Sequence, residues 1–161
     1  MDIAMSRTAK HKPKTRRGRP RLETQRTLYQ IKLSGWDFTW SFSLALPNYS
    51  RANEGHYQEH MILTLKGEVL YPEIFKYPEV ECQLYADPRL SQDIEPPKGI
   101  GSMTASGTQL VAYIAVPRER MDTLTGMADR LLSLELNATP LHYRRALVMS
   151  MHLGTEPEPD W

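Results

Sequence analysis

The chain of 161 residues has a single cysteine, only three phenylalanines and no long apolar run. One cysteine cannot form a disulfide within the chain, so nothing in the sequence is typical of a secreted, disulfide-stabilised domain. The longest compact apolar run covers about residues 110–116, far short of the roughly 20 residues that cross a bilayer as a helix. The N-terminus also lacks the apolar core of a secretory signal. We therefore expect no membrane association and a cytoplasmic location. The alternatives are a nucleoid-associated location and, if the source is eukaryotic, a nuclear one.

Acidic side chains are almost absent from the first 26 residues. That segment has nine Lys and Arg against two acidic residues, a charge of +7, whereas the rest of the chain has eleven basic and seventeen acidic residues, a charge of −6. It also has few apolar side chains to bury, and two prolines and a glycine disfavour a helix. The sequence predicts three parts: a disordered basic arm at 1–26, a β-rich globular domain at 27–154 and a disordered acidic tail at 155–161.

The centre of the basic arm combines cationic residues with glycine and proline. Arg17-Gly18-Arg19-Pro20 resembles the core of an AT-hook. The resemblance implies that two extended arginines lie along the minor groove of A·T-rich DNA, whose negative potential attracts arginine. We predict contact with DNA or RNA through Lys10, Lys12, Lys14, Arg16, Arg17, Gly18, Arg19, Pro20 and Arg21. The alternatives are a targeting signal and an inert solubilising tail.

After the arm, apolar residues recur at every second position, which is typical of β-strands. Between Leu33 and Trp36 the apolar phase moves from odd to even positions. A shift of one residue turns the other face of a strand toward the core, so we predict a β-bulge or a corner at Gly35. Further alternating segments predict strands near residues 61–71, 80–86, 100–105, 108–116, 134–138 and 146–153.

Only residues 118–132 have a helical period, with Met121, Leu124 and Ala128 on one stripe. Seven or eight short strands with one helix predict a mainly β fold. The architecture is then a two-layer β-sandwich or an open barrel flanked by the helix. The alternative is an α+β fold in which the helix covers a single antiparallel sheet.

Trp36, Phe38, Trp40 and Phe42 form an aromatic stripe on one face of the predicted first strand. We interpret these side chains as core, because a β-domain of this size needs large residues to fill it. The alternative is a stacking surface for sugars or bases.

Few residues carry a recognisable site chemistry. His56-Tyr57-Gln58-Glu59-His60 resembles the zinc motif of inverzincin metallopeptidases, in which His56 and His60 would be ligands and Glu59 the base. That chemistry requires a helix, whereas the pattern here favours a loop that leads into a strand. Cys82 is predicted to be a buried thiol, and Arg144 and Arg145 to form a secondary cationic spot beside the last strand.

These features favour a protein without catalytic activity and without a cofactor. The leading hypothesis is a binding or accessory protein whose basic arm contacts nucleic acid, while the β-domain engages a protein partner or a second copy of itself. The second hypothesis is an interaction or structural module whose arm serves only localisation or charge. The third is a zinc hydrolase that uses the histidine motif.

Overall fold

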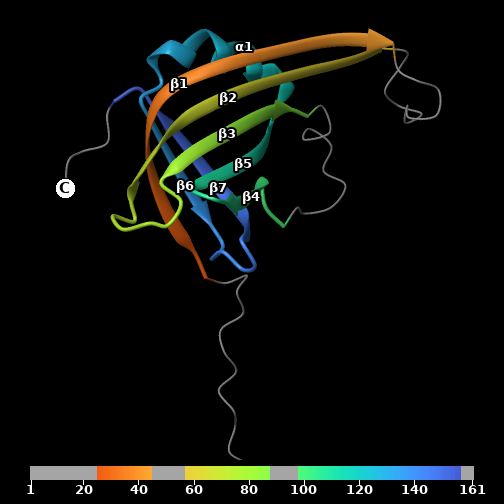
Figure 1. Cartoon of the computed structure of the whole chain (residues 1–161). Helices are drawn as coiled ribbons and strands as arrows, with labels where there is room; N and C mark the ends of the chain where they lie inside the picture. The colour runs from red at the N-terminus through yellow and green to blue at the C-terminus, as the bar shows by residue number, and fades with distance from the viewer. Residues whose placement is uncertain (1–24, 45–56, 88–97, 157–161) are drawn as a thin grey trace, which may run out of the picture.

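The computed structural model describes residues 25–44, 57–87 and 98–156. Within these residues seven strands and one α-helix follow each other along the chain (Figure 1). The strands are β1 (Thr27–Leu44), β2 (Tyr57–Tyr71), β3 (Glu79–Ala86), β4 (Gly101–Ser106), β5 (Gln109–Val116), β6 (Ser133–Ala138) and β7 (Arg145–Gly154). The helix α1 (Arg118–Met127) is followed by one 3₁₀ turn, η3 (Ala128–Arg130). The predicted mainly β class is confirmed, and the α-helix ends earlier than the predicted residue 132.

The seven strands close into a barrel in the order β1-β2-β3-β5-β4-β7-β6, with β6 paired to β1. Of the architectures that the sequence predicted, a barrel therefore forms, and it is closed rather than open. All neighbouring strands are antiparallel except β3 and β5, which are parallel. This parallel pair arises because β4, although it follows β3 in the sequence, pairs with the far edge of β5 and with β7.

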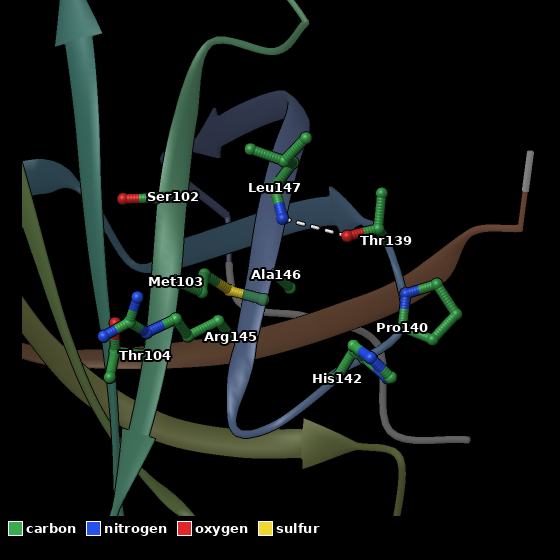
Figure 2. A pocket seen from close by; sticks show the side chains of 9 residues that line it. All are labelled: Ser102, Met103, Thr104, Thr139, Pro140, His142, Arg145, Ala146 and Leu147. Carbon is green, nitrogen blue, oxygen red and sulfur yellow. Dashed lines mark hydrogen bonds between the residues drawn. The ribbon is translucent and has the colours of Figure 1, made fainter. Parts of the chain in front are cut away.

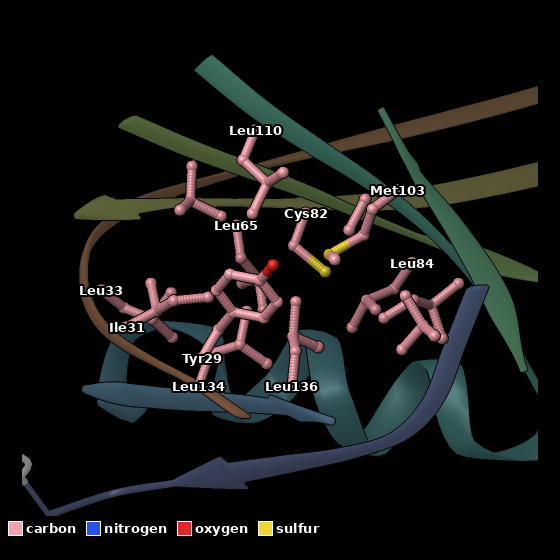
Figure 3. Close-up of a cluster of buried hydrophobic side chains, with 14 of the residues drawn as sticks. Tyr29, Ile31, Leu33, Leu65, Cys82, Leu84, Met103, Leu110, Leu134 and Leu136 are labelled. Carbon is pink, nitrogen blue, oxygen red and sulfur yellow. The ribbon is translucent and has the colours of Figure 1, made fainter. Parts of the chain in front are cut away.

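The barrel interior is filled by the apolar side chains that alternate along each strand. Figure 3 shows side chains from β1, β2, β3, β4, β5 and β6 converging on one cluster. In β1 the inward residues are Tyr29, Ile31 and Leu33, and their neighbours on the opposite face are more exposed. Because adjacent residues of a strand point to opposite faces, this alternation separates the core from solvent.

Both ends of the barrel are covered. At one end lies α1, whose single fully buried side chain, Met121, belongs to the core cluster. At the other end the segment after β2 folds back. Phe75 there makes edge-on contacts with the rings of Tyr29 and Tyr77, at centroid distances of 5.3 and 5.7 Å.

The predicted irregularity in β1 is a β-bulge. Leu33 pairs with Gly67 and Gly35 pairs with Lys66, so Ser34 has no partner in β2. The extra residue explains the change of phase seen in the sequence: odd positions face the interior before the bulge, and even positions share the inward face after it. Beyond the bulge, β1 and β2 continue as a pair and project past the other strands (Figure 1).

Candidate functional site

The projecting end of the β1–β2 pair is a two-stranded hairpin. It consists of Trp40–Leu44 and Tyr57–Met61, here called the hairpin extension. Pairing of β2 with β3 begins only at Ile62, and pairing of β1 with β6 stops at Lys32. Among the described residues no third strand pairs with the hairpin extension.

Two of the four side chains of the aromatic stripe, Trp40 and Phe42, lie on this extension. From the sequence we interpreted the stripe as core, but most of it is exposed. Trp36, Trp40 and Phe42 are 45%, 57% and 55% exposed, and only Phe38 packs partly against the core cluster. The prediction was wrong because an alternating pattern identifies the inward face of a strand but does not show where the barrel ends. Here the strand is longer than the barrel, so its inward face continues into solvent.

One face of the hairpin extension is apolar except for Glu59, which pairs with Phe42. Directly paired residues of antiparallel strands share a face, so Leu44 and Tyr57 lie with Trp40 and Phe42. We call these four side chains the apolar face; each is more than half exposed. The ring of Phe42 stacks on Trp40 at 6.2 Å and on Tyr57 at 5.3 Å, with interplanar angles of 2° and 15°. The rings therefore present mainly their edges to anything that lies over them.

The charged residues of the extension do not form a metal site. His56 lies outside the described residues, and Glu59 and His60 are adjacent residues of β2, so they point to opposite faces of the strand. The Glu59 carboxylate forms an ion pair with the guanidinium of Arg118 in α1 and accepts a hydrogen bond from it, with an N–O distance of 2.7 Å. The helical geometry that the zinc motif requires is absent here, because residues 57–71 are a strand. In the part of the chain that the structure describes, no three His, Cys, Asp or Glu side chains cluster to hold a metal.

Cys82 is buried in the core between β2 and β5, as predicted. Burial raises the pKa of its thiol to about 12, because the thiolate is poorly solvated in an apolar interior. A neutral, inaccessible thiol is a structural group and not a nucleophile.

The predicted cationic spot lies in a tight turn between β6 and β7. His142 and Arg145 exchange two backbone hydrogen bonds, of 2.8 and 3.0 Å. The two central residues, Tyr143 and Arg144, have φ values of +49° and +62°. This left-handed pair is typical of a type I′ turn, which favours Asn-Gly, and costs energy for residues with a side chain. The turn holds Tyr143 87% exposed and leaves both arginines without an ion pair to any described residue.

A pocket of about 440 Å³ lies beside this cationic turn on the outside of β4 and β7. Figure 2 shows Arg145 alongside Thr104 of β4, and His142 near Pro140 on the other side of the pocket. The Thr139 hydroxyl accepts a hydrogen bond of 2.9 Å from the backbone N–H of Leu147, which fixes the pocket wall. A guanidinium, an imidazole and exposed hydroxyls are groups that bind phosphate. The sequence analysis did not find this pocket, because its residues come from separate segments.

The basic arm joins the barrel at this same end. The arm residues from Lys10 to Arg21 lie outside the described residues, but the described chain starts at Gln25. Thr27 then pairs with Ala138, the last residue before the segment that forms the pocket and turn. Figure 1 shows the start of β1 beside the connection between β6 and β7. Arg26, Arg144 and Arg145 therefore belong to one end of the barrel.

None of the helices in the described residues is long and apolar enough to cross a membrane. Comparison of the chain with models of known protein families, with curated proteins and with solved structures finds no match.

Proposed function

We propose that this protein is a non-enzymatic nucleic-acid-binding protein in which the basic arm and the turn His142–Arg145 contact the phosphate backbone together. The main support is the register between β1 and β6, which brings the attachment point of the arm next to the cationic turn. An arm with a charge of +7 supplies non-specific attraction to a polyanion, and the turn supplies cations on a rigid scaffold.

The chemistry of the turn supports phosphate as its ligand. The segment from Thr139 to Arg145 contains two arginines and a histidine and no acidic residue. The backbone strain at Tyr143 and Arg144 keeps these side chains at the tip of the turn, and such strain is found preferentially at functional sites. The AT-hook resemblance of the arm adds an expected preference for A·T-rich DNA, read through the narrow minor groove.

Fluorescence anisotropy with labelled A·T-rich and G·C-rich duplexes, measured over a range of salt concentrations, tests the proposal. The double variant Arg144→Gln/Arg145→Gln should reduce the magnitude of the log–log salt slope by about 2, because roughly 0.9 counterion is released for each phosphate neutralised. Arg17→Gln/Arg19→Gln should weaken binding and reduce the A·T preference.

The matched control is Arg120→Gln/Arg130→Gln, which removes the same charge from exposed positions on α1 and η3 at the other end of the barrel. This control should leave the salt slope unchanged. An equal loss in both double variants would mean that only net charge matters. Binding that survives removal of residues 1–26 unchanged would exclude the arm from the interaction.

A further inference from the structure

The apolar face of the hairpin extension takes no part in the proposed nucleic-acid contact. We infer that it is a self-association surface, on which the same face of a second copy of this chain packs to form a symmetric dimer. This inference goes beyond the proposed function, since it names what the β-domain engages and does not depend on nucleic acid.

The hairpin extension is poorly stabilised within one chain. Two strands without a third strand or a covering layer are only marginally stable in water. In the described residues the outer edges of Trp40–Leu44 and Tyr57–Met61 are unpaired. Exposed edges are usually protected by lysine, proline or a bulge, and neither segment contains lysine or proline. A partner that covers the apolar face would supply the missing layer.

The area of the apolar face suits a dimer. Fully burying one aromatic side chain removes about 150–250 Å² from solvent, and the four side chains are 55–68% exposed. Each copy therefore offers on the order of 400 Å², and the half-exposed Trp36 adds roughly 100 Å². Two such faces in contact bury about 1,000 Å², the lower bound for a specific interface. An apolar patch of this size on a single chain is itself typical of an interaction site.

The charges on the extension favour a second copy over a polyanion. Trp40–Leu44 and Tyr57–Met61 contain no lysine or arginine, which phosphate contacts would need. Within these two segments, the only Asp, Glu, Lys or Arg on the same side as the apolar face is Glu59, and Arg118 already pairs with it. Two copies of this face can therefore meet without repulsion between like charges, as an isologous contact requires.

The orientation of the rings also argues against stacked bases. A base stacks on the flat face of an aromatic ring, but the faces of Phe42 are turned toward Trp40 and Tyr57. The exposed edges are suited instead to packing among side chains, as in the centre of a protein–protein interface, where aromatic residues are enriched.

Sedimentation equilibrium of the full chain, without nucleic acid and over roughly a hundredfold range of concentration, tests the inference, because dimer formation follows mass action. In the upper part of the concentration range, the apparent mass of the wild type should be twice the chain mass of 18.5 kDa. Phe42→Glu places a charge on the apolar face and should weaken self-association roughly thirtyfold or more, the effect of losing a central interface residue.

Ser41→Glu is the matched control, since it introduces the same charge one residue away on the opposite, polar face of β1. This variant should dimerise like the wild type. A wild type that stays monomeric throughout, or a Phe42→Glu variant that still dimerises, would overturn the inference. Loss of the dimer in both variants would do the same, because the strand edge and not the apolar face would then be responsible.

Hydrogen exchange on the wild type gives a second measurement that needs no variant and does not depend on the folding of Phe42→Glu. Amides of Trp40–Leu44 and Tyr57–Met61 should exchange more slowly as protein concentration rises, because the covered hairpin opens less often. Exchange rates that do not change with concentration would refute the dimer. Neither experiment contains nucleic acid. A failure of this inference can therefore be distinguished from a failure of the proposed function.

Discussion

Replacing Met121 by alanine tests what holds α1 on the end of the barrel. The helix has ten residues and no side-chain cap at its N-terminus, and isolated helices shorter than about 12–15 residues are marginal in water. Its stability therefore depends on docking. Two contacts are candidates: the buried Met121 side chain and the ion pair between Arg118 and Glu59.

The magnitudes of the two contacts differ. Met121 is 0% exposed, and truncating a fully buried methionine to alanine costs about 2–5 kcal/mol. The ion pair is partly solvent-exposed, with side-chain exposures of 55% and 25%, and such pairs contribute at most about 1 kcal/mol. We expect Met121→Ala to lower the free energy of unfolding by about 2–4 kcal/mol and Glu59→Gln to lower it by less than about 1 kcal/mol.

Urea denaturation measures both changes, and hydrogen exchange locates them. In Met121→Ala the amides of Arg118–Met127 should lose protection before those of the strands, since the helix undocks locally. The reasoning would be refuted if Met121→Ala cost less than Glu59→Gln. Unchanged protection of α1 in Met121→Ala would refute it as well.

Three further predictions concern the core, the glycines and the cationic turn. The pKa of the Cys82 thiol is raised from its ordinary 9.0 to about 12. Between these two pH values the thiol is therefore ionised in the unfolded chain but not in the folded one. Stability measured by denaturant unfolding should thus fall as pH rises from 9.0 toward 12, and Cys82→Ala should lose less over this range. Gly126→Ala, where nothing lies within 4 Å of the added methyl, should stabilise α1 by up to about 1 kcal/mol. Gly101→Ala should lower the unfolding midpoint, because its methyl would overlap the backbone of β5. A midpoint of Gly101→Ala above that of Gly126→Ala would contradict the strand register. Tyr143→Asn/Arg144→Gly should raise the thermal midpoint through about 1–3 kcal/mol of relieved strain while weakening binding to duplex DNA, and an unchanged midpoint would argue against the left-handed turn.

Much of the barrel could be predicted from the sequence, because alternation depends only on local geometry. Tyr29, Ile31 and Leu33 face the core as the pattern indicates, and the change of phase predicted a bulge at Gly35, one residue from the unpaired Ser34. Strand order could not be predicted in the same way. The parallel pairing of β3 with β5 depends on which strand edges, distant in sequence, meet. The alternation of apolar residues along a strand is the same whichever strand it pairs with.

The candidate sites were less predictable, for two physical reasons. The exposure of Trp40 and Phe42 depends on where β3 and β6 stop pairing with the longer strands, which is information from other segments. The turn at Tyr143 and Arg144 has left-handed dihedrals without the asparagine or glycine that usually reveals them. Only the burial of Cys82 followed directly from its position in an alternating strand.

Closure of the barrel by β1 and β6 has a consequence for the order of events during synthesis. Strand β1, which begins at Thr27, can pair fully with its second neighbour, β6, only when Ala138 has been made. Until then a nascent chain carries an unsatisfied row of backbone groups along β1, and pairings this remote in sequence form late. A chain that ends before Ala138 therefore lacks the complete β1–β6 pairing and cannot close the barrel.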